Sequence, residues 1–407
     1  MDARDPLARF RGRYVIDEPD LIYLDGNSLG RMPQEALAIV NRVVGDEWGE
    51  RLIRSWNEGW WELQVDLGDR LAPILGASAG EVIISDSTSV NLYKLALAAI
   101  RASPGGRRIV TDDMNFPTDI YVLKGVADAV GGELVIVESG RSADPLQALE
   151  TAIDEDTALV SVSHTSFKTG YTYDVARITA MAHRVDALTL WDLSHAVGAV
   201  PINLNDANVD LAVGCTYKYL NGGPGSPAFL YVRSDLQAGL DNPIPGWWGH
   251  AAPFAFDLEF KPVEGIRKFH AGTMPIISLA TISAGISDVV EAGMPQIRAK
   301  SVALSEFLVE QVEEHLAHLG FVLASPRNPE RRGSHISLSH PDAWSIDRAL
   351  IEMGKVIPDY RAPDNLRLGL SPLYTTFIDV HTAVQRIKAI VEGGHHLAHG
   401  DVRLTVT

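Results

Sequence analysis

Short apolar runs alternate with amphipathic stretches along most of the chain, and this alternation limits the folds that it can adopt. Six of the runs are Glu81–Ser85, Arg108–Thr111, Glu133–Val137, Ala158–Val162, Leu188–Asp192 and Ala228–Val232. Continuous apolar runs of this length are typical of strands that are buried on both faces. Between them, Asp174–Ala187 carries its apolar residues on one helical face. Strands that alternate with helices predict a mostly parallel sheet that is covered by helices on both sides.

The pattern changes after about residue 292, where a smaller α+β unit is expected. A long amphipathic helix that ends at Gly320, two weaker strands and a final helix are predicted at Ser301–Leu319, His335–Leu338, Leu366–Leu370 and Phe377–Val391. A length of 407 residues fits two domains. We therefore predict an α/β fold with a large domain over residues 60–292, and a small domain formed by residues 1–59 and 293–407.

The charge of the chain argues against two classes of partner. It has 52 Asp and Glu residues against 35 Lys and Arg residues, a formal net charge of −17. This excess repels phosphate backbones and anionic lipid, so neither nucleic acid nor a membrane surface is an expected partner. The single cysteine, Cys215, excludes a disulfide framework and a Cys-based zinc site. The first residues, MDARDPLARFRGRYVIDEPD, are too charged for a secretory signal, so we expect a cytoplasmic protein.

Lys218 stands at a position where a lysine can be reactive. It follows the apolar run Leu211–Cys215 and precedes a loop rich in Gly and Pro, in the sequence TYKYLNGGPG. A desolvated lysine amine is a nucleophile toward carbonyl groups, and pyridoxal-phosphate enzymes hold their cofactor on such a lysine. Considered alone, Lys218 is more readily explained as a surface lysine at the end of a strand.

Asp192 ends another apolar run, 26 residues before Lys218. A carboxylate buried at a strand end is costly without a positive partner, and the protonated ring nitrogen of pyridoxal phosphate is such a partner. The alternative for Asp192 alone is the N-cap of a helix. Together and in this order, Asp192 and Lys218 predict a pyridoxal-phosphate site.

Six motifs make the sequence resemble the kynureninase family, in the same order along the chain. They are LDGNSLG (24–30), NFPTD (115–119), DLSHAVG (192–198), TYKYLNGGPG (216–225), GWWGH (246–250) and NLRLGLSPLY (365–374). The resemblance covers nearly the full length. It implies the aspartate-aminotransferase-like fold (fold type I) of pyridoxal-phosphate enzymes and a homodimer with active sites at the subunit interface.

The resemblance also implies a reaction and a cofactor. The reaction is the hydrolysis of L-kynurenine to anthranilate and L-alanine, with weaker action on 3-hydroxykynurenine. It belongs to tryptophan degradation through kynurenine and can also serve NAD biosynthesis. The cofactor is pyridoxal 5′-phosphate, bound covalently as a Schiff base with Lys218.

By the same resemblance, Lys218 would form the Schiff base and Asp192 would pair with the pyridine nitrogen. Asp119 would lie close to the same edge of the ring, and Phe116 would stack on its face. His195 would sit near the cofactor, with a core histidine as the alternative. The residues that would hold the phosphate are Thr88, Ser89, Ser163, Tyr217 and, from the other subunit, Trp247. Thr88 and Ser89 open a helix pattern, whose N-terminus favours an anion; without the resemblance they would be interpreted as helix caps.

Substrate-binding residues follow from the resemblance too. Arg367 would clamp the α-carboxylate, because the planar guanidinium matches a carboxylate with two parallel hydrogen bonds. A structural ion pair is the alternative. His250 and Thr273 would border the aromatic end of the substrate, with Thr273 also close to the cofactor. Two weaker candidates for the pocket wall are Asn27 and Trp56.

Tyr217 is the candidate general acid or base for the later steps. A tyrosine beside a cationic cofactor can have a lowered pKa.

Two departures from the vertebrate members of the family favour unsubstituted L-kynurenine as the substrate. The vertebrate enzymes, which act on 3-hydroxykynurenine, have an asparagine where Thr273 falls. Their pocket histidine has no counterpart around Trp48–Gly49.

Another enzyme of the same fold, such as a cysteine desulfurase or an aminotransferase, is the nearest alternative. A desulfurase needs a reactive cysteine on a mobile loop, whereas Cys215 lies in an apolar run. Desulfurases also usually carry a histidine directly before the Schiff-base lysine, where this chain has Tyr217. A non-catalytic binding protein of this fold would have lost Lys218 or Asp192.

A histidine-rich segment near the end of the chain has metal-like spacing. His395, His396 and His399 occur in HHLAHG without a carboxylate partner. We therefore expect no metal site there.

Overall fold

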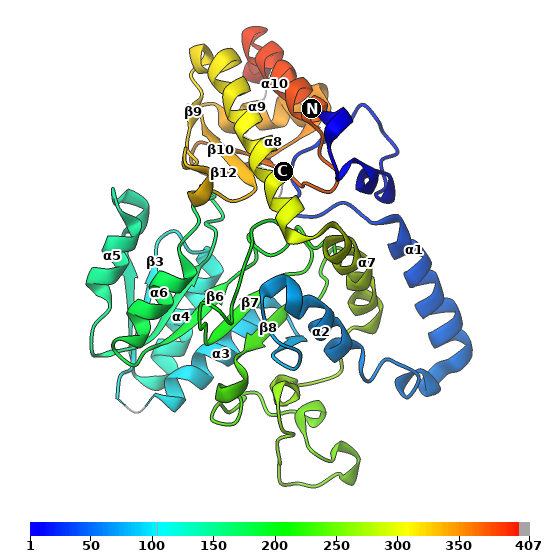
Figure 1. The fold of residues 1–407 in the computed structure, drawn as a ribbon, viewed down its shortest axis with the longest axis vertical. Helices are drawn as coiled ribbons and strands as arrows, with labels where there is room; N and C mark the ends of the chain where they lie inside the picture. Colours follow the sequence, from blue (N-terminus) through cyan, green and yellow to red (C-terminus); the bar gives the residue numbers. More distant parts are fainter. Residues whose placement is uncertain (104, 399–407) are drawn as a thin grey trace.

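The computed structural model describes residues 1–103 and 105–398, and its largest element is a sheet of seven strands (Figure 1). The strand order is β2-β8-β7-β6-β5-β3-β4. The strands from β4 to β7 pair in parallel, and β8 is antiparallel to both of its neighbours. Their bounds are β2 (Val82–Ile84), β3 (Arg108–Asp112), β4 (Glu133–Val137), β5 (Thr157–Ser163), β6 (Leu188–Asp192), β7 (Leu211–Gly214) and β8 (Phe229–Val232). The predicted mostly parallel sheet is confirmed.

Helices cover both faces of this sheet. One face packs on α3 (Thr88–Ala102) and α4 (Pro117–Val130). The other face packs on α2 (Leu63–Leu75), α5 (Pro145–Ala152), α6 (Val175–His183) and α7 (Ile276–Ala292). Alternate residues of one strand enter different clusters, as Ile83 and Ile84 do. This two-sided burial is the reason why the strands are continuous apolar runs.

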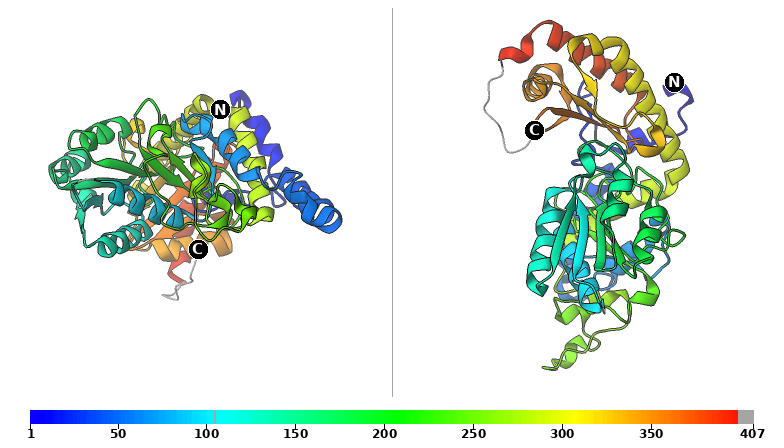
Figure 2. Two further views of the ribbon diagram at one scale, coloured as in Figure 1. Left: turned by 90° about the horizontal axis from the view of Figure 1, so that it is seen from below. Right: turned by 90° about the vertical axis from the view of Figure 1, so that its left-hand side faces the viewer.

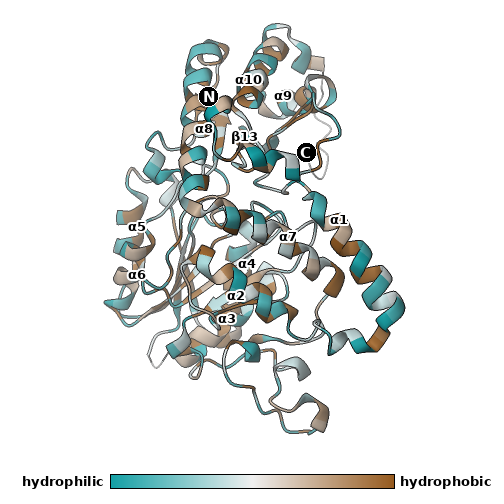
Figure 3. Ribbon diagram, turned by 45° about the vertical axis from the view of Figure 1, so that its right-hand side comes forward, coloured by the Kyte–Doolittle hydropathy of each residue, from teal (hydrophilic) through white to brown (hydrophobic). Residues whose placement is uncertain are grey.

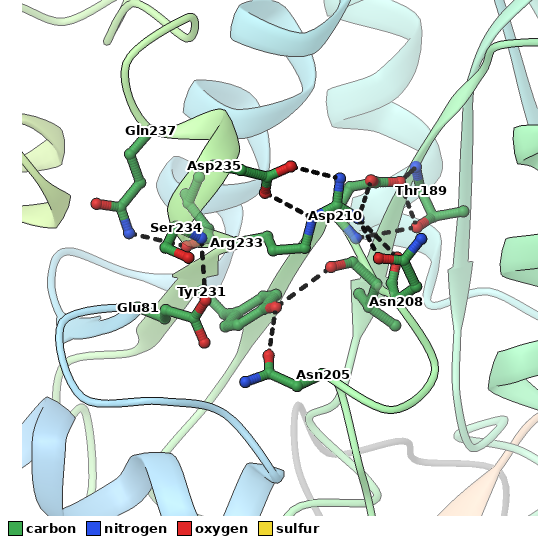
Figure 4. Close-up of polar contacts among 12 residues, drawn as sticks. Glu81, Thr189, Asn205, Asn208, Asp210, Tyr231, Arg233, Ser234, Asp235 and Gln237 are labelled. Atoms are coloured by element: carbon green, nitrogen blue, oxygen red, sulfur yellow. Dashed lines mark hydrogen bonds and ion pairs between the residues drawn. The ribbon is translucent and has the colours of Figure 1, made fainter.

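A polar network fixes the amino ends of β6 and β7 (Figure 4). Asp210, directly before β7, accepts hydrogen bonds from the Thr189 backbone N–H at 2.8 Å and from the Thr189 hydroxyl at 3.0 Å. Its other oxygen accepts from Arg233 Nη1 at 2.8 Å. Because the Asp210 carboxylate is buried, these bonds offset its desolvation. The network lies at the end of the sheet opposite to Lys218.

The C-terminal elements form a second body at one end of the molecule (Figure 2). Its antiparallel sheet has the order β12-β13-β10-β9. These strands are β9 (Val322–Leu323), β10 (His335–Ser339), β12 (Asp359–Arg361) and β13 (Asn365–Gly369). The sheet shares a hydrophobic core with α8 (Met294–His315), α9 (Ala343–Ala349) and α10 (Phe377–Glu392). The predicted smaller α+β unit is present, and its sheet is antiparallel.

The N-terminal segment contacts both bodies. β1 (Ile22–Tyr23) pairs in parallel with β11 (Val356–Ile357), whereas α1 (Gln34–Asn41) packs on α7. We keep as a proposal the division into a large domain at residues 60–292 and a small domain at residues 1–59 and 293–407. The pairing of β1 with β11 supports it.

α8 begins at Met294, seven residues before the predicted start at Ser301. Pro295 lies in its first turn, a position where the fixed φ of proline favours helix initiation. None of the described helices is by itself long and apolar enough to span a membrane; α7 and α8 meet the criteria only as a pair, and this pair is bent by 85°.

Asp347 in α9 is buried, and neither of its carboxylate oxygens has a hydrogen-bond partner among the described residues. Burial, followed by the charge of Asp359, raises its pKa from 3.8 to about 7. Between these two values the unfolded chain releases this proton while the folded chain keeps it. The free energy of unfolding of the protein should therefore fall as the pH rises through that window.

Asp347→Asn should remove this pH dependence. Relative to the unsubstituted protein, the variant should gain about 2 kcal/mol of unfolding free energy between pH 5 and pH 7, because one pKa unit corresponds to about 1.4 kcal/mol. Above pH 8 the difference should level off. Urea unfolding of both proteins at several pH values measures it, and a constant difference would contradict the assignment of a buried, protonated carboxyl.

Candidate active site

The carboxyl ends of the parallel strands meet at a cavity of about 220 Å³. Loops after β2, β3, β5, β6 and β7 line it, together with residues of the N-terminal segment and of the C-terminal body. Parallel sheets bind ligands at this edge. The cavity brings together the following residues predicted from the sequence: Asn27, Thr88, Ser89, Phe116, Asp119, Asp192, His195, Tyr217, Lys218 and Arg367.

Lys218 lies in the loop that follows β7, with its amine beside His195. Lys218 Nζ is 3.1 Å from His195 Nε2 and 3.3 Å from His195 Nδ1. Burial, followed by the charge of Lys218, lowers the pKa of His195 well below its usual value. His195 is therefore neutral, and it contacts the amine without adding positive charge to the cavity.

The LDGNSLG motif supports the lysine loop through Gly30. The Gly30 backbone N–H donates to the Tyr217 carbonyl at 2.7 Å. A Cβ atom at Gly30 would lie 2.3 Å from the Lys218 carbonyl oxygen. Only glycine allows this close approach of the two backbones, so two motifs far apart in the sequence meet here.

Asp192 and Asp119 form a buried carboxyl pair in the wall of the cavity. Asp192 ends β6 and accepts a hydrogen bond from the Ser194 backbone N–H at 2.7 Å. Asp119 lies in the first turn of α4. Burial, followed by the charge of Asp192, raises the pKa of Asp119 well above its usual value, so Asp119 is the member that holds a proton. Asp119 Oδ2 has no hydrogen-bond partner among the described residues. The pair can therefore accept a cationic N–H group.

Thr88 and Ser89 occupy the first turn of α3. The N-cap of this helix is Ser87, whose side chain accepts from the Val90 backbone N–H at 3.4 Å. Thr88 and Ser89 are thus not the caps, and both line the cavity. The helix N-terminus offers N–H groups and a favourable dipole to an anionic group such as a phosphate.

Arg367 lines the cavity, but it is already paired. Its Nε and Nη2 donate to the two carboxylate oxygens of Asp359, at 2.7 and 2.6 Å. Both side chains are 1% exposed, so this is a buried, bidentate ion pair. Arg367 therefore forms the structural ion pair that sequence analysis gave as the alternative. It also lines the cavity, as a residue that binds a substrate carboxylate must.

Five predicted residues do not line the cavity of this chain. Ser163 is buried and donates its hydroxyl to the Asn115 side-chain oxygen, which explains its position structurally. Trp56 makes edge contacts with Trp60 and Trp248. The other three are Trp247, His250 and Thr273, which lie on the segment between β8 and α7.

The expected lowering of the Tyr217 pKa is not found in the protein alone. The neighbouring Cys215, followed by burial, raises the pKa of Tyr217. The prediction depended on the positive charge of a cofactor, so the side chains present shift this pKa in the opposite direction. Burial also raises the pKa of the Cys215 thiol, as expected for an unreactive cysteine.

Sequence analysis missed several residues of the cavity, namely Ser28, Thr118, Phe167, Ser194 and Arg361. Ser28 follows Asn27 in the LDGNSLG motif, so the position of Asn27 could have indicated that Ser28 also lies at the cavity. Arg361 precedes Arg367 by six residues in the adjacent strand, where an antiparallel pairing could have been inferred. Phe167 lies in an irregular loop, for which the sequence carries no periodic signal.

The described residues contain no group of three or more His, Cys, Asp or Glu side chains that could hold a metal ion. Of the histidines with metal-like spacing, His395 and His396 belong to a short 3-10 helix. His399 lies outside the described residues.

Comparison with known sequences gives consistent matches. The model of the kynureninase C-terminal domain matches residues 297–387. A kynureninase of Pseudomonas fluorescens is 45% identical over 397 residues, covering 96% of this chain and 94% of the relative. A kynureninase of Burkholderia pseudomallei (strain K96243) has the same identity and coverage.

Comparison with solved structures gives the fold. An apo cysteine desulfurase from Thermococcus onnurineus NA1 matches with a TM-score of 0.79 and 20% identity, covering 96% of this chain and 99% of that one. A C-DES mutant with glycine covalently linked to its pyridoxal-phosphate cofactor matches with a TM-score of 0.80 and 18% identity, covering 91% and 97%. At these identities the likeness shows the fold alone. It confirms the predicted fold type I of pyridoxal-phosphate enzymes.

Proposed function

The chain belongs to the kynureninase family, and we propose that it hydrolyses L-kynurenine to anthranilate and L-alanine with pyridoxal 5′-phosphate as its cofactor. The observation that carries the proposal is the cavity at the strand ends. There, Lys218 and the Asp119–Asp192 pair line one cavity, in a chain that is 45% identical to a kynureninase over nearly its full length.

The side chains of the cavity fit this cofactor. Lys218 would hold its aldehyde carbon, and the Asp192 carboxylate, beside the unpartnered oxygen of Asp119, would hold the ring nitrogen. Thr88 and Ser89, at the N-terminus of α3, would bind the phosphate. The exposed ring of Phe116 and the neutral His195 would contact the ring faces. When bound, the cofactor supplies an electron sink for the electrons released at Cα of the substrate.

Different residues around the substrate would then carry out the individual proton transfers. The free amine of Lys218 would be the base at Cα. Burial lowers the pKa of its neighbour His195 well below the usual value, so His195 is too weak a base to compete for this proton. Water adds to the side-chain ketone, and the hydrated carbonyl collapses to release anthranilate. The remaining three-carbon fragment would take up one proton at Cβ and recover the Cα proton from Lys218 to become L-alanine.

Tyr217 is the proposed donor of a proton in the cleavage steps. It lines the cavity next to Lys218. Tyr217→Phe should lower turnover by about 10²-fold, the lower range for the loss of a general acid or base, without abolishing cofactor binding. Steady-state rates and a cofactor titration measure the two effects.

Tyr219→Phe is the matched control for this substitution. Tyr219 lies in the same loop, and its buried hydroxyl has no hydrogen-bond partner among the described residues. Turnover should survive in this variant. If Tyr217→Phe also turns over at the unsubstituted rate, Tyr217 has no acid or base role.

A homodimer would complete this site. Trp247, His250 and Thr273 lie outside the cavity of their own chain, on a segment that projects from the large body (Figure 1). Two of the neighbouring side chains, Phe254 and Phe256, are 69% and 81% exposed. Such exposure on a projecting segment is typical of an interface. We propose that this segment reaches the cavity of the partner subunit.

α1 and the two short helices that follow it, Arg42–Arg51 and Leu52–Trp56, form a second apolar surface. Figure 3 shows hydrophobic and hydrophilic residues alternating along α1, which stands out from the body. Leu37, Trp48 and Ile53 are exposed here by 57, 57 and 74%. The proposed dimer would bury these side chains as well.

We further propose unsubstituted L-kynurenine as the preferred substrate, because Thr273 stands where the vertebrate enzymes have asparagine. A cytoplasmic location and roles in tryptophan degradation and NAD biosynthesis complete the proposal.

The test is the release of anthranilate from L-kynurenine by the purified, cofactor-loaded protein, with 3-hydroxykynurenine and L-cysteine as parallel substrates. Fast release from L-kynurenine, with slower turnover of 3-hydroxykynurenine, is expected. Sulfide from cysteine without anthranilate would replace the proposal by a desulfurase.

A further inference from the structure

The donors of Arg367 are almost fully committed within the protein. Besides its two bonds to Asp359, Nη2 donates to Ser28 Oγ at 3.2 Å and Nη1 donates to the Phe167 carbonyl. A guanidinium group has five N–H donors. The contacts of the described residues therefore leave Arg367 a single N–H, on Nη1. An incoming carboxylate cannot receive two hydrogen bonds from Arg367 without displacing Ser28 or the Phe167 carbonyl.

Arg361 is more exposed than Arg367 and has more N–H donors without a partner in the described part of the chain. Its guanidinium also lines the cavity, and its side chain is 34% exposed, against 1% for Arg367. Nη2 is 2.7 Å from Asp359 Oδ2 and 3.4 Å from Ser28 Oγ, and Nη1 donates to the Tyr360 carbonyl at 2.8 Å. Among these contacts, the N–H of Nε and one N–H of Nη1 have no partner.

Asp359 joins the two guanidinium groups. Its Oδ2 accepts from Arg367 Nη2 at 2.6 Å and from Ser28 Oγ at 2.7 Å, and contacts Arg361 Nη2. Asp359 and Arg367 are direct cross-strand partners between β12 and β13, and Arg361 lies two residues further along β12. Side chains at this spacing lie on the same face of the strand, which holds the two arginines side by side.

The cluster has one positive charge more than it can neutralise by itself. Two guanidinium groups share the carboxylate of Asp359. Burial, followed by the charge of Asp359, raises the pKa of Asp25 to about 8, so Asp25 is uncharged at neutral pH. Asp347, the other nearby carboxyl, also has a raised pKa, of about 7. An uncompensated buried charge is unfavourable, and one ligand carboxylate would balance it.

We propose that Arg361 is a second residue that binds the α-carboxylate of the amino-acid substrate, which it shares with Arg367, and that Asp359 is the positioning residue that holds the two guanidinium groups together. This inference deepens the proposed function and rests on it. Arg367 provides one N–H of a buried guanidinium, and Arg361 provides donors from a more exposed one.

The test compares two ligands that differ only in the carboxylate. L-alanine, the expected product, and ethylamine, its counterpart without a carboxylate, are titrated into the cofactor-loaded protein, and the cofactor absorbance reports binding. In Arg361→Gln the dissociation constant of alanine should rise by about 10- to 100-fold, the range for hydrogen bonds to a charged group. That of ethylamine should change by less than about 3-fold, within the effect of an ordinary surface substitution.

Two further variants serve as a control and as a conservative substitution. Arg327→Gln removes a positive charge from an exposed ion pair with Glu313 in the same body, and both dissociation constants should stay unchanged. Arg361→Lys keeps the charge but loses the planar fork, so alanine should bind more tightly than to Arg361→Gln and more weakly than to the unsubstituted protein. If Arg361→Gln does not fold, Arg361→Lys alone carries the test.

Equal changes for alanine and ethylamine, or an unchanged affinity for alanine, would overturn the assignment of Arg361. Failure of the proposed function has a different signature. The unsubstituted protein would then bind alanine but release no anthranilate from L-kynurenine, and the alanine titration does not depend on that reaction.

Discussion

Lys218→Ala should lower the rate of anthranilate release by at least about 10³-fold, because one substitution removes both the proposed covalent anchor of the cofactor and the proposed base at Cα. The amine of Lys218 is the nitrogen in the cavity that contacts neutral His195. Alanine at this position cannot accept the Cα proton, and no other described residue with an amine lines the cavity.

The rate of anthranilate release is the first readout, and borohydride reduction is the second. The unsubstituted protein should lose its yellow colour on reduction and retain the cofactor after denaturation, whereas Lys218→Ala should release it. Lys124→Ala is the matched control, because Lys124 lies on the exposed face of α4 in an ion pair with Asp128. A Lys218→Ala protein that turns over within about 10-fold of the unsubstituted rate would contradict the assigned role, since base catalysis alone contributes 10²- to 10⁴-fold.

Asp192→Asn should lower turnover by about 10²- to 10³-fold, the range observed when one preorganised electrostatic contact to a reacting system is removed. Asparagine has nearly the same shape and can still accept the hydrogen bond from the Ser194 backbone N–H. It cannot carry the charge that holds a proton on the ring nitrogen, so the electron sink is weakened while the fold is kept.

Asp119→Asn provides the comparison that separates charge from position. Asp119 is the member of the pair that already holds a proton, because burial and the charge of Asp192 raise its pKa. Asp119→Asn should therefore lower turnover by less than about 10-fold, which corresponds to roughly 1.4 kcal/mol of activation free energy. Single-turnover rates of both variants, with cofactor content measured in parallel, decide between them. Equal losses in the two variants would contradict the assignment of the ionised carboxylate to Asp192.

The large sheet could be predicted from the sequence because its strands are buried on both faces. Burial of this kind demands continuous apolar runs, and Leu188–Asp192 was predicted with the bounds that β6 has. The residues that follow these runs, such as Lys218 and Asp192, were then placed at one edge by the rules of parallel sheets. The start of α8 was missed because residues 294–300 show no clear helical amphipathicity, and only Pro295 marks it.

The environment of each site residue was much harder to predict. The pairing of Arg367 with Asp359 depends on the register of β12 and β13, two short strands with no strong pattern of their own. Ser163, which was expected at the phosphate, hydrogen-bonds to Asn115, a contact that no sequence period reveals. The Tyr217 pKa responds to Cys215, two residues earlier, and to burial. The residues that lie at the site were predictable where each directly follows a single strand. The contacts between residues of separate loops were not predictable.

The central claim is that this chain cleaves a carbon–carbon bond of L-kynurenine by hydrolysis. The most direct test is turnover of L-kynurenine in ¹⁸O-labelled water, with both products quantified by mass spectrometry. The account predicts anthranilate and L-alanine in equal amounts, with one labelled oxygen in the anthranilate carboxylate. Loss of kynurenine without anthranilate, or alanine formed without label in its partner product, would contradict it.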